Sequence, residues 1–370
     1  MSLSKYIYNN FSYKITGDQI NGPLVHLSFI VSEHPVIKVF RKKFHPNIKE
    51  FKNIIYEIKK YSSQIVVTDY RYNLKKLRPD IVVGFGAAAG SSVEMGGRFL
   101  YYATGAAADF QNKNTIMEGE YFKSHFNVFG VNIENHLRLA EADTVRVEKL
   151  ARDVMLIGNS WTRKTFHNKN VVGLLNGMYL PASLVMGVSI KNNGILWIGS
   201  KGIIHKGLHI AAEVAIKSYS VLYVVGVSDV ERDLAKFILD KTGCKYVMFG
   251  YISVGGSLWG EIVEKCYCVL GCSVSEGMST GLLTAISAGL FPISTDSCGI
   301  NYGPIVNFED RSTLVDRIIN IIDIIKSKSG EYNDLRLDIS KRVSVECSEN
   351  NFSLSVGEVF FKYMVDYAAN

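Results

Sequence analysis

The chain of 370 residues contains only seven prolines and no apolar run of about 18 residues, the length that a membrane-spanning helix needs. Its first residues, MSLSKYIYNNFSYK, lack the apolar core of a secretory signal peptide. Hydrophobic residues make up 47% of the chain, and its length exceeds what a single hydrophobic core commonly serves. We therefore expect a cytoplasmic protein of two domains.

Cysteine is absent from the first half of the chain, and the spacing of the others does not suit a metal. Cys266 and Cys268 are separated by one residue, whereas a zinc site uses paired C-x-x-C spacing with further ligands. None of the eight histidines stands at H-x-x-E-H spacing, and no D-x-D pair follows an apolar strand. We expect buried free thiols and no metal. The cysteines are Cys244, Cys266, Cys268, Cys272, Cys298 and Cys347.

The net charge of +6 is unevenly distributed. Residues 38–78 hold twelve Lys and Arg against three Asp and Glu, a local excess of nine positive charges. One interpretation is a solvated helix face, and the other is a surface that contacts anionic lipid head groups or a polyanionic or lipid-linked substrate. The second interpretation predicts a peripheral contact with the inner face of the membrane. No aromatic-interleaved basic motif accompanies the charge, so we expect no nucleic acid partner.

Short β-branched runs alternate with longer amphipathic segments, a pattern typical of parallel sheets covered by helices. The fold class is therefore α/β, with two Rossmann-like, doubly wound, parallel-sheet domains. Strands are predicted at 24–31, 64–68, 81–84, 99–103 and 154–158, and then at 194–198, 220–225, 246–249, 268–271 and 291–294. Helices are predicted at 48–61, 133–151, 207–218, 230–242, 257–265, 282–288, 312–328 and 351–369.

The domain boundary is predicted at a turn-rich stretch. Residues 176–181 read NGMYLP, which is typical of a linker. The first domain is expected to span residues 1–185 and the second 186–350, with the last segment, 351–370, returning to pack on the first domain. Ligands of such sheets bind at the carboxyl ends of the strands, and between two domains the cleft is the expected site.

The most informative stretch is SEGMSTGLLTAISAGLFPISTD, residues 275–296. Gly277, Ser279, Thr280 and Gly281 form a turn of small residues that opens a helix, and the unpaired amides at a helix start favour a phosphate group. The carboxylate of Glu276 beside that turn would repel phosphate. It is better suited to bind neighbouring hydroxyl groups, so the pair of features indicates a nucleotide-sugar.

Two other strand ends offer complementary groups. After strand 194–198 the sequence GSKGIIHKG places Lys206 in a glycine-bounded loop before a helix, which suits a diphosphate. After strand 246–249, Gly250, Tyr251 and Ile252 present backbone groups for a nucleobase edge. A surface lysine is the commoner reading of Lys206 taken alone, but the three strand ends together predict base, phosphate and sugar contacts.

These segments resemble the donor-binding domain of family 4 retaining glycosyltransferases of the GT-B fold. The resemblance rests on ILWIGSKGIIHKGLHIAAEVA, VMFGYI and SEGMSTGLLTAISAGLFPISTDSCGI, in the family's order and spacing. The closing NNFSLSVGEVFFKYMVDY resembles the family's crossing C-terminal helix. GDQING, YYATGAAADFQN and AEADTVRVEKLARDVMLIGNSWTRKTF resemble its acceptor domain more loosely. The resemblance implies two domains facing across a cleft.

The resemblance also implies roles for single residues. Lys206 matches the diphosphate-binding lysine, and Glu276 matches the first glutamate of the E-x7-E motif, which contacts the transferred sugar. The turn whose amides meet the diphosphate matches Gly277, Met278, Ser279, Thr280 and Gly281. Tyr251 and Ile252 match base-contacting positions, and Gly22 matches the glycine loop of the first domain that approaches the donor.

The chain departs from the family pattern at three positions. The second glutamate of E-x7-E, which holds the ribose, is Thr284 here. The arginine that usually precedes the lysine is absent, and Ser200 and Lys201 occupy its place. The histidine that the family commonly carries near the reacting centre is Ala107, with Asp109 nearby. We count Asp109 with Glu276 and Lys206 as catalytic candidates, and Ser200, Lys201 and Thr284 as donor contacts.

The expected function is that of a metal-independent, hexosyltransferase-like glycosyltransferase. It would move a sugar from a nucleotide-diphosphate sugar, with retention, to a glycan or lipid-linked acceptor in surface polysaccharide biosynthesis. The donor is a substrate, and no cofactor is expected. One alternative is a catalytically degenerate paralogue that acts as a binding or scaffolding subunit. A nucleotide-sugar epimerase on the same fold is the other alternative.

Overall fold

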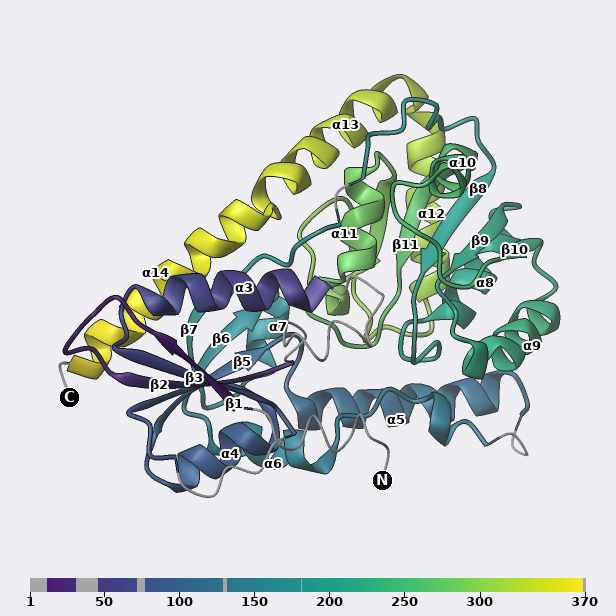
Figure 1. Cartoon of the computed structure of the whole chain (residues 1–370). Helices are drawn as coiled ribbons and strands as arrows, with labels where there is room; N and C mark the ends of the chain where they lie inside the picture. Colours follow the sequence, from purple (N-terminus) through teal and green to yellow (C-terminus); the bar gives the residue numbers. More distant parts are fainter. Residues whose placement is uncertain (1–11, 31–45, 72–76, 129–131, 181, 369–370) are drawn as a thin grey trace.

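The computed structural model describes residues 12–30, 46–71, 77–128, 132–180 and 182–368. These residues form two α/β domains, each built on one sheet (Figure 1). The first sheet has the strand order β1-β3-β2-β4-β5-β6-β7, and the second has the order β10-β9-β8-β11-β12-β13. This architecture confirms the predicted α/β class with two parallel-sheet domains.

In the first sheet β1 pairs antiparallel with β3, and the other neighbouring pairs are parallel. Its strands read as near-continuous apolar runs because helices cover them. The strands are β1 (Ser12–Thr16), β2 (Leu24–Phe29), β3 (Gln64–Asp69), β4 (Ile81–Gly84), β5 (Arg98–Ala103), β6 (Asp153–Ile157) and β7 (Asn170–Leu175). The helices are α3 (Pro46–Lys59), α4 (Gly86–Glu94), α5 (Ala108–His125), α6 (Ala142–Leu150) and α7 (Ser160–Lys164), with the short 3-10 helix η1 (Glu134–His136).

The second sheet is parallel throughout. Its strands are β8 (Gly194–Ile198), β9 (Val221–Val225), β10 (Tyr246–Met248), β11 (Cys266–Gly271), β12 (Phe291–Thr295) and β13 (Ile305–Val306). Its helices are α8 (Leu208–Lys217), α9 (Arg232–Thr242), α10 (Ser257–Lys265), α11 (Thr280–Ser287), α12 (Leu314–Ser327) and α13 (Ser329–Glu346), with 3-10 helices η2 (Asp229–Glu231) and η3 (Asp296–Cys298). All six cysteines are buried and unpaired, as predicted.

The last helix, α14 (Glu349–Ala368), returns from the second domain to the first. It continues the line of α13 and packs against α3 and β7 (Figure 1). The Phe360 ring lies 5.9 Å from the Tyr61 ring, and the Ser353 hydroxyl donates to the buried Glu57 carboxylate over 2.8 Å. This contact anchors the end of the chain on the first domain.

Helix α5 belongs to the first domain in sequence but also packs on the second. In Figure 1 it reaches out from the first sheet along the underside of the second domain, toward α8. Its Glu118 carboxylate accepts hydrogen bonds from His209 of α8 over 2.7 Å and from Arg311 over 3.1 Å. The interface between the domains is thus partly polar and buried.

The structure bears out each predicted strand region and corrects several helices. Strands β1, β7 and β13 and helices α4, α5, α7 and α13 were not predicted. The prediction of one helix over 133–151 was wrong, because only η1 and α6 are helical there and the segment between them is extended or turning. Asn112 of α5 holds that segment through both the amide and the carbonyl of Ala140, at 2.6 and 3.2 Å.

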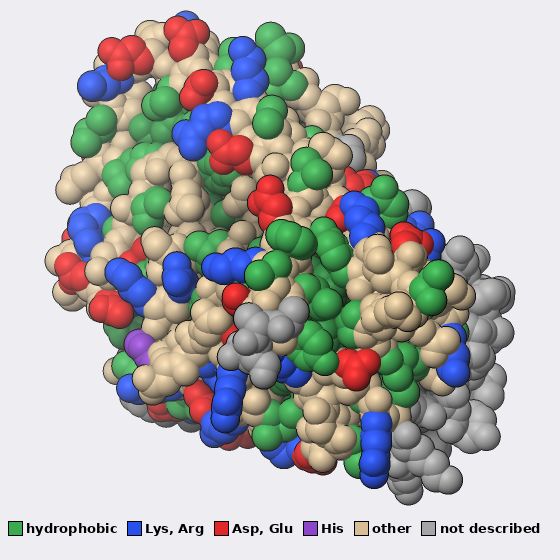
Figure 2. Space-filling model, turned by 90° about the vertical axis from the view of Figure 1, so that its left-hand side faces the viewer, with side chains coloured by type: hydrophobic (Ala, Val, Ile, Leu, Met, Phe, Trp, Pro, Cys, Tyr) green, Lys and Arg blue, Asp and Glu red, His purple; other side chains and the backbone are tan. Residues whose placement is uncertain are grey.

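Half of the basic charges in 38–78 lie outside the described residues. Of the rest, Lys49 pairs with Glu349, Lys59 with Asp18 and Lys60 with Glu57. Figure 2, which views the molecule from the left of Figure 1, shows Lys and Arg side chains interspersed with acidic and hydrophobic ones. Within the described part of the chain, no helix is long and apolar enough to cross a membrane. The predicted membrane contact stays a prediction.

Candidate functional site

The carboxyl ends of strands from both sheets meet at Gly277, which follows β11 in the second domain. A Cβ atom at position 277 would lie 2.5 Å from the carbonyl oxygen of Thr104, after β5, and 2.6 Å from that of Ile157, at the end of β6. Gly105 approaches from the same side, since a Cβ there would lie 3.2 Å from the Gly277 nitrogen. Only glycine permits this approach of two backbones.

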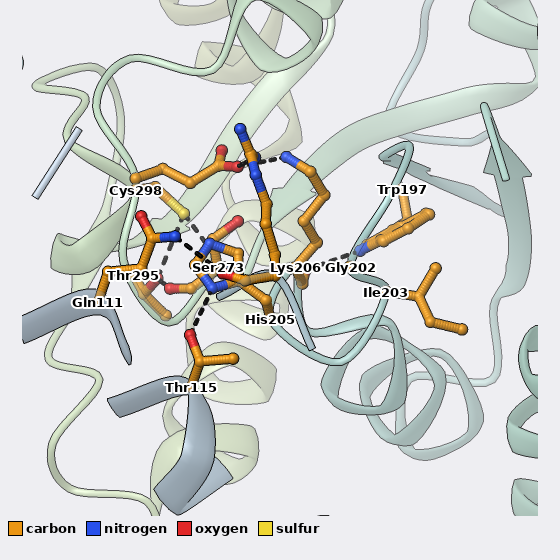
Figure 3. A network of polar contacts seen from close by, with 12 residues as sticks. Gln111, Thr115, Trp197, Gly202, Ile203, His205, Lys206, Ser273, Thr295 and Cys298 are labelled. Carbon is orange, nitrogen blue, oxygen red and sulfur yellow. Dashed lines mark hydrogen bonds and ion pairs between the residues drawn. The ribbon is translucent and has the colours of Figure 1, made fainter. Parts of the chain in front are cut away.

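Lys206 lies in the loop between β8 and α8, and neighbouring groups fix its position. The Trp197 indole donates to the Lys206 carbonyl over 3.0 Å (Figure 3), and Gly199 leaves space for the lysine stem, because a Cβ there would lie 2.9 Å from Lys206 Cδ. The amides of Gly202 and Ile203 both donate to the buried Glu231 carboxylate. These hydrogen bonds fix the backbone of the β8–α8 loop in place without a ligand.

Glu276 and Lys206, predicted from separate strand ends, form a buried ion pair. Both residues are 8% exposed, and Glu276 Oε1 accepts a hydrogen bond from Lys206 Nζ and another from Arg138 Nη1, the latter over 2.9 Å. Burial raises the pKa of Glu276, but the positive charges of Lys206 and Arg138 outweigh burial and lower the pKa to about 2. The carboxylate is therefore ionised over the physiological range.

Arg138 is a site residue that the sequence reasoning missed. It follows η1 in the first domain and stands 138 positions from Glu276 in the chain. Its backbone carbonyl accepts a hydrogen bond from the Gln111 amide of α5 over 2.8 Å. Nothing in the local sequence distinguishes Arg138 from other surface arginines, because its partner is set by the packing of the two domains.

His205 is adjacent to Lys206, but its side chain contacts α5 of the first domain and not Glu276. Its Nδ1 lies 2.9 Å from the Thr115 hydroxyl of α5, and Figure 3 shows Thr115 below the His205 ring. Burial lowers the pKa of His205 to about 3, so the ring is neutral at physiological pH. The ring therefore joins the domains by a hydrogen bond and adds no charge beside Glu276.

The turn at the start of α11 divides into a buried and an open part. Met278 is buried with Gly277, and its sulfur accepts a hydrogen bond from the Gly177 amide over 3.2 Å. Ser279, Thr280 and Gly281 are half-buried, and the Ser279 side chain does not cap the helix. The first amides of α11 thus remain available for an anion.

The predicted nucleoside contacts lie at neighbouring strand ends. Tyr251 is exposed and Ile252 half-buried, just after β10, and the Gly250 carbonyl accepts a hydrogen bond from Gly226 after β9. Ser200 and Lys201 are exposed at the start of the β8–α8 loop. These residues follow the same edge of the sheet as Lys206.

Thr284, a predicted ribose contact, is fully buried inside α11. Its hydroxyl donates to the Thr280 carbonyl over 2.6 Å and accepts from the Leu180 amide over 3.0 Å. The side chain therefore ties the interdomain linker to the helix. Because the Thr284 side chain is fully buried, a ribose hydroxyl reaches it only if the linker or the helix moves.

Asp109 and Gly22 are not brought to Glu276. Asp109 is exposed at the start of α5 and pairs with Lys149 of α6 over 3.1 Å. Gly22 lies at the amino end of β2, where a Cβ would lie 2.8 Å from the Tyr61 carbonyl oxygen, whereas Gly277 faces the carboxyl ends of the sheet. A groove of about 740 Å³ between the 18–23 loop and the end of α14 adjoins Gly22. We leave Gly22 out of the proposed donor contacts.

Within the ranges that the structure describes, no cluster of three or more His, Cys, Asp and Glu side chains could hold a metal ion. The buried carboxylates between the domains instead form ion pairs, Glu276 with Lys206 and Arg138, and Glu118 with Arg311.

Two Rossmann-like domains that face each other through the carboxyl ends of their strands define the GT-B fold, and this chain has that fold. Its residues at the junction follow β5, β6, β8 and β11, which is where open sheets of this kind bind ligands. No family model matches the chain, and no curated protein matches it by sequence.

Solved structures confirm the fold. WaaG, a glycosyltransferase involved in lipopolysaccharide biosynthesis, is 13% identical, with a TM-score of 0.52 over 91% of this chain and 99% of WaaG. Anabaena Alr3699/HepE in complex with UDP and glucose is 12% identical, with a TM-score of 0.54 over 91% of this chain and 99% of that one. Sucrose-phosphate synthase from Thermosynechococcus elongatus is 12% identical, with a TM-score of 0.56 over 78% and 74%.

Proposed function

We propose that the protein is a retaining glycosyltransferase that moves a sugar from a nucleotide-diphosphate sugar to a glycan or lipid-linked acceptor, in surface polysaccharide biosynthesis. The observation that carries this proposal is the meeting of Lys206, Glu276 and the open start of α11 at the junction of the two domains. The similarity to structures such as HepE with UDP and glucose supports it at the level of fold.

Lys206 and the first amides of α11 would hold the diphosphate, and Lys201 adds charge at the mouth of the loop. Leaving-group charge grows in the transition state, so preorganised cations and amides stabilise it more than the ground state. Tyr251 and Ile252 would contact the nucleoside. Glu276 would accept hydrogen bonds from hydroxyl groups of the transferred sugar.

In the proposed reaction the bond between the anomeric carbon and the diphosphate oxygen breaks. The acceptor oxygen forms its bond on the same face of the sugar, and its proton passes to the departing diphosphate. Neither step uses a metal ion or a cofactor. The acceptor would lie against the first domain, beside the buried Ala106–Ala108 segment, and a lipid-linked acceptor would bring the basic 38–78 stretch close to the membrane.

Because Glu276 and Lys206 are almost fully buried, we infer that the donor enters after the domains separate. The linkers that allow this movement are the stretch between β7 and β8 and the break between α13 and α14. Closure over the donor then excludes water, which limits hydrolysis of the donor.

The test is donor binding and cleavage by the full chain. UDP, GDP and ADP are compared by thermal shift, because a ligand that binds only the folded state raises the melting temperature. The matching sugar donor is then incubated without acceptor, and the anomer released by slow hydrolysis is read at once by proton NMR. We expect one nucleotide to stabilise the protein and the donor's own anomer to be released first. Lys206→Ala should weaken the binding of that nucleotide and slow the cleavage of the donor, each about tenfold or more.

A second candidate function is a scaffolding subunit without turnover. It is favoured by Thr284 and Asp109, whose side chains are engaged away from the site. Nucleotide binding with no cleavage of any donor in the same assay would select this candidate. Absence of both binding and cleavage would reject the two together.

A further inference from the structure

Two cations from different domains converge on one carboxylate oxygen at the site. Lys206 of the second domain and Arg138 of the first both donate to Glu276 Oε1, which leaves this cluster with one positive charge in excess. One such cation already balances the charge of a single carboxylate. The second cation, beside the open start of a helix, favours the binding of a further anion.

The Arg138 stem lies against the loop that carries Lys206. Gly202 adopts a φ of +86°, and a Cβ at that position would lie 2.6 Å from Arg138 Cβ. Gly202 directly follows Ser200 and Lys201. These two residues occupy the place where the resemblance leads us to expect an arginine, which this chain lacks. Arg138 thus brings a guanidinium to this place from the other domain.

The backbone of Arg138 is held in place from α5. Gln111 donates to the Arg138 carbonyl over 2.8 Å, and Asn112 binds both the amide and the carbonyl of Ala140. Figure 3 shows Gln111 on the α5 side of the network and Lys206 on the loop side. The side chain itself is 49% exposed, so its guanidinium keeps donors free for a ligand beyond Glu276.

We propose that Arg138 is a donor-binding residue that holds the diphosphate together with Lys206, and so replaces the arginine absent from the β8–α8 loop. This inference rests on the proposed function. The planar guanidinium suits two phosphate oxygens at once, which a lysine at position 201 does not match. Because Arg138 and Lys206 belong to different domains, a diphosphate bound by both links the domains and stabilises their closed arrangement.

The test measures the affinity of the full chain for UDP and UMP by calorimetry, with GDP and ADP as further probes. Arg138→Gln is expected to weaken UDP binding about tenfold, or about 1.4 kcal/mol, and to change UMP binding less than about twofold. Arg138→Lys recovers part of the loss. The control is Arg342→Gln on α13, since Arg342 is also 49% exposed and also pairs with a glutamate, Glu346, but forms no ion pair with Glu276 among the residues that the structure describes.

A structural role for Arg138, limited to orienting Glu276, is separated by a double-mutant cycle. In a Glu276→Gln background, Arg138→Gln still weakens UDP binding if Arg138 contacts the diphosphate. The inference is overturned if the loss disappears in that background, or if UDP and UMP weaken equally. Failure of the unaltered protein to bind any of the three diphosphates would instead reject the proposed function.

Discussion

Gly277 of the second domain lies against the Thr104 carbonyl oxygen of the first, so close that a Cβ at position 277 would stand 2.5 Å from it. The same Cβ would stand 2.6 Å from the Ile157 carbonyl oxygen. Both obstacles are backbone atoms, which cannot rotate away as a flexible side chain can. This contact sets how closely the two domains approach and how completely Glu276 is covered.

We predict that Gly277→Ala separates the domains and destabilises the protein by about 1–3 kcal/mol, the usual cost of overpacking. Thermal unfolding measures the loss, and small-angle scattering measures the expected increase in radius. The control is Gly260→Ala in α10, where no atom lies within 4 Å of the added methyl group and helix propensity predicts a gain of up to about 1 kcal/mol. Unchanged melting and radius in Gly277→Ala would contradict the contact.

Glu276→Gln is predicted to tighten UDP binding several-fold while transfer falls about a hundredfold. The substitution removes the anion that holds Lys206 and Arg138, so both cations turn to the diphosphate, but the sugar loses its charged acceptor. Calorimetry and donor cleavage report the two effects separately. Glu261→Gln on the exposed face of α10 serves as the control, and transfer at the original rate in Glu276→Gln would remove Glu276 from the mechanism.

Glu118→Gln is predicted to destabilise the domain interface by about 3 kcal/mol, because it leaves Arg311 without its buried counterion. Burial raises the pKa of Glu118, but His209 and Arg311 lower it to a net value below the ordinary one. The stabilisation is therefore present above the ordinary glutamate pKa and is lost as the pH falls through the lower folded value.

Denaturation by urea at pH 7 and at lower pH tests this prediction. Glu120→Gln is the matched control on the same helix, since Glu120 pairs with Lys123 at the surface and such pairs contribute about 0.5 kcal/mol or less. Equal losses in the two variants would show that Glu118 does not hold the domains together.

We predict that two buried histidines, His26 and His205, make the folded protein less stable in mild acid. Burial lowers the pKa values of His26 and His205 to about 3, against 6.5 for an exposed histidine. The unfolded chain takes up protons below that value and the folded chain does not, so stability is complete above pH 6.5 and falls as the pH decreases. The expected loss at pH 5.5 is about 1.4 kcal/mol for each histidine.

His26→Asn should remove one of the two contributions to this slope. His26 lies in β2 and contacts Thr68 of β3 over 2.8 Å. The exposed His167 supplies the control, because His167→Asn should leave the slope between pH 8 and 5.5 unchanged. An unchanged slope in His26→Asn would mean that the His26 ring takes up its proton in the folded protein as readily as in the unfolded chain.

The strands from β2 to β6 and from β8 to β12 were predictable because a buried parallel strand is apolar on both faces, whereas β1, β7 and β13 at the ends of the sheets were missed. Helix α5 was not predictable, since the residues that it buries against the second domain include Thr115 and Glu118, which are polar and leave no apolar stripe. The same reason explains why Arg138 was missed. Its environment depends on α5 and on the loop of the other domain.

The sequence by itself determined which groups follow the strand ends, because parallel strands place their carboxyl ends at one edge. Lys206 and Glu276 were recognisable for that reason, although 70 positions separate them. Only the tertiary structure decided that Arg138 joins them, that the Thr284 hydroxyl binds the Leu180 amide of the linker, and that Asp109 pairs with Lys149 and not with a residue of the site. Those outcomes depend on how two domains pack, and no local pattern of residues records the geometry of that contact.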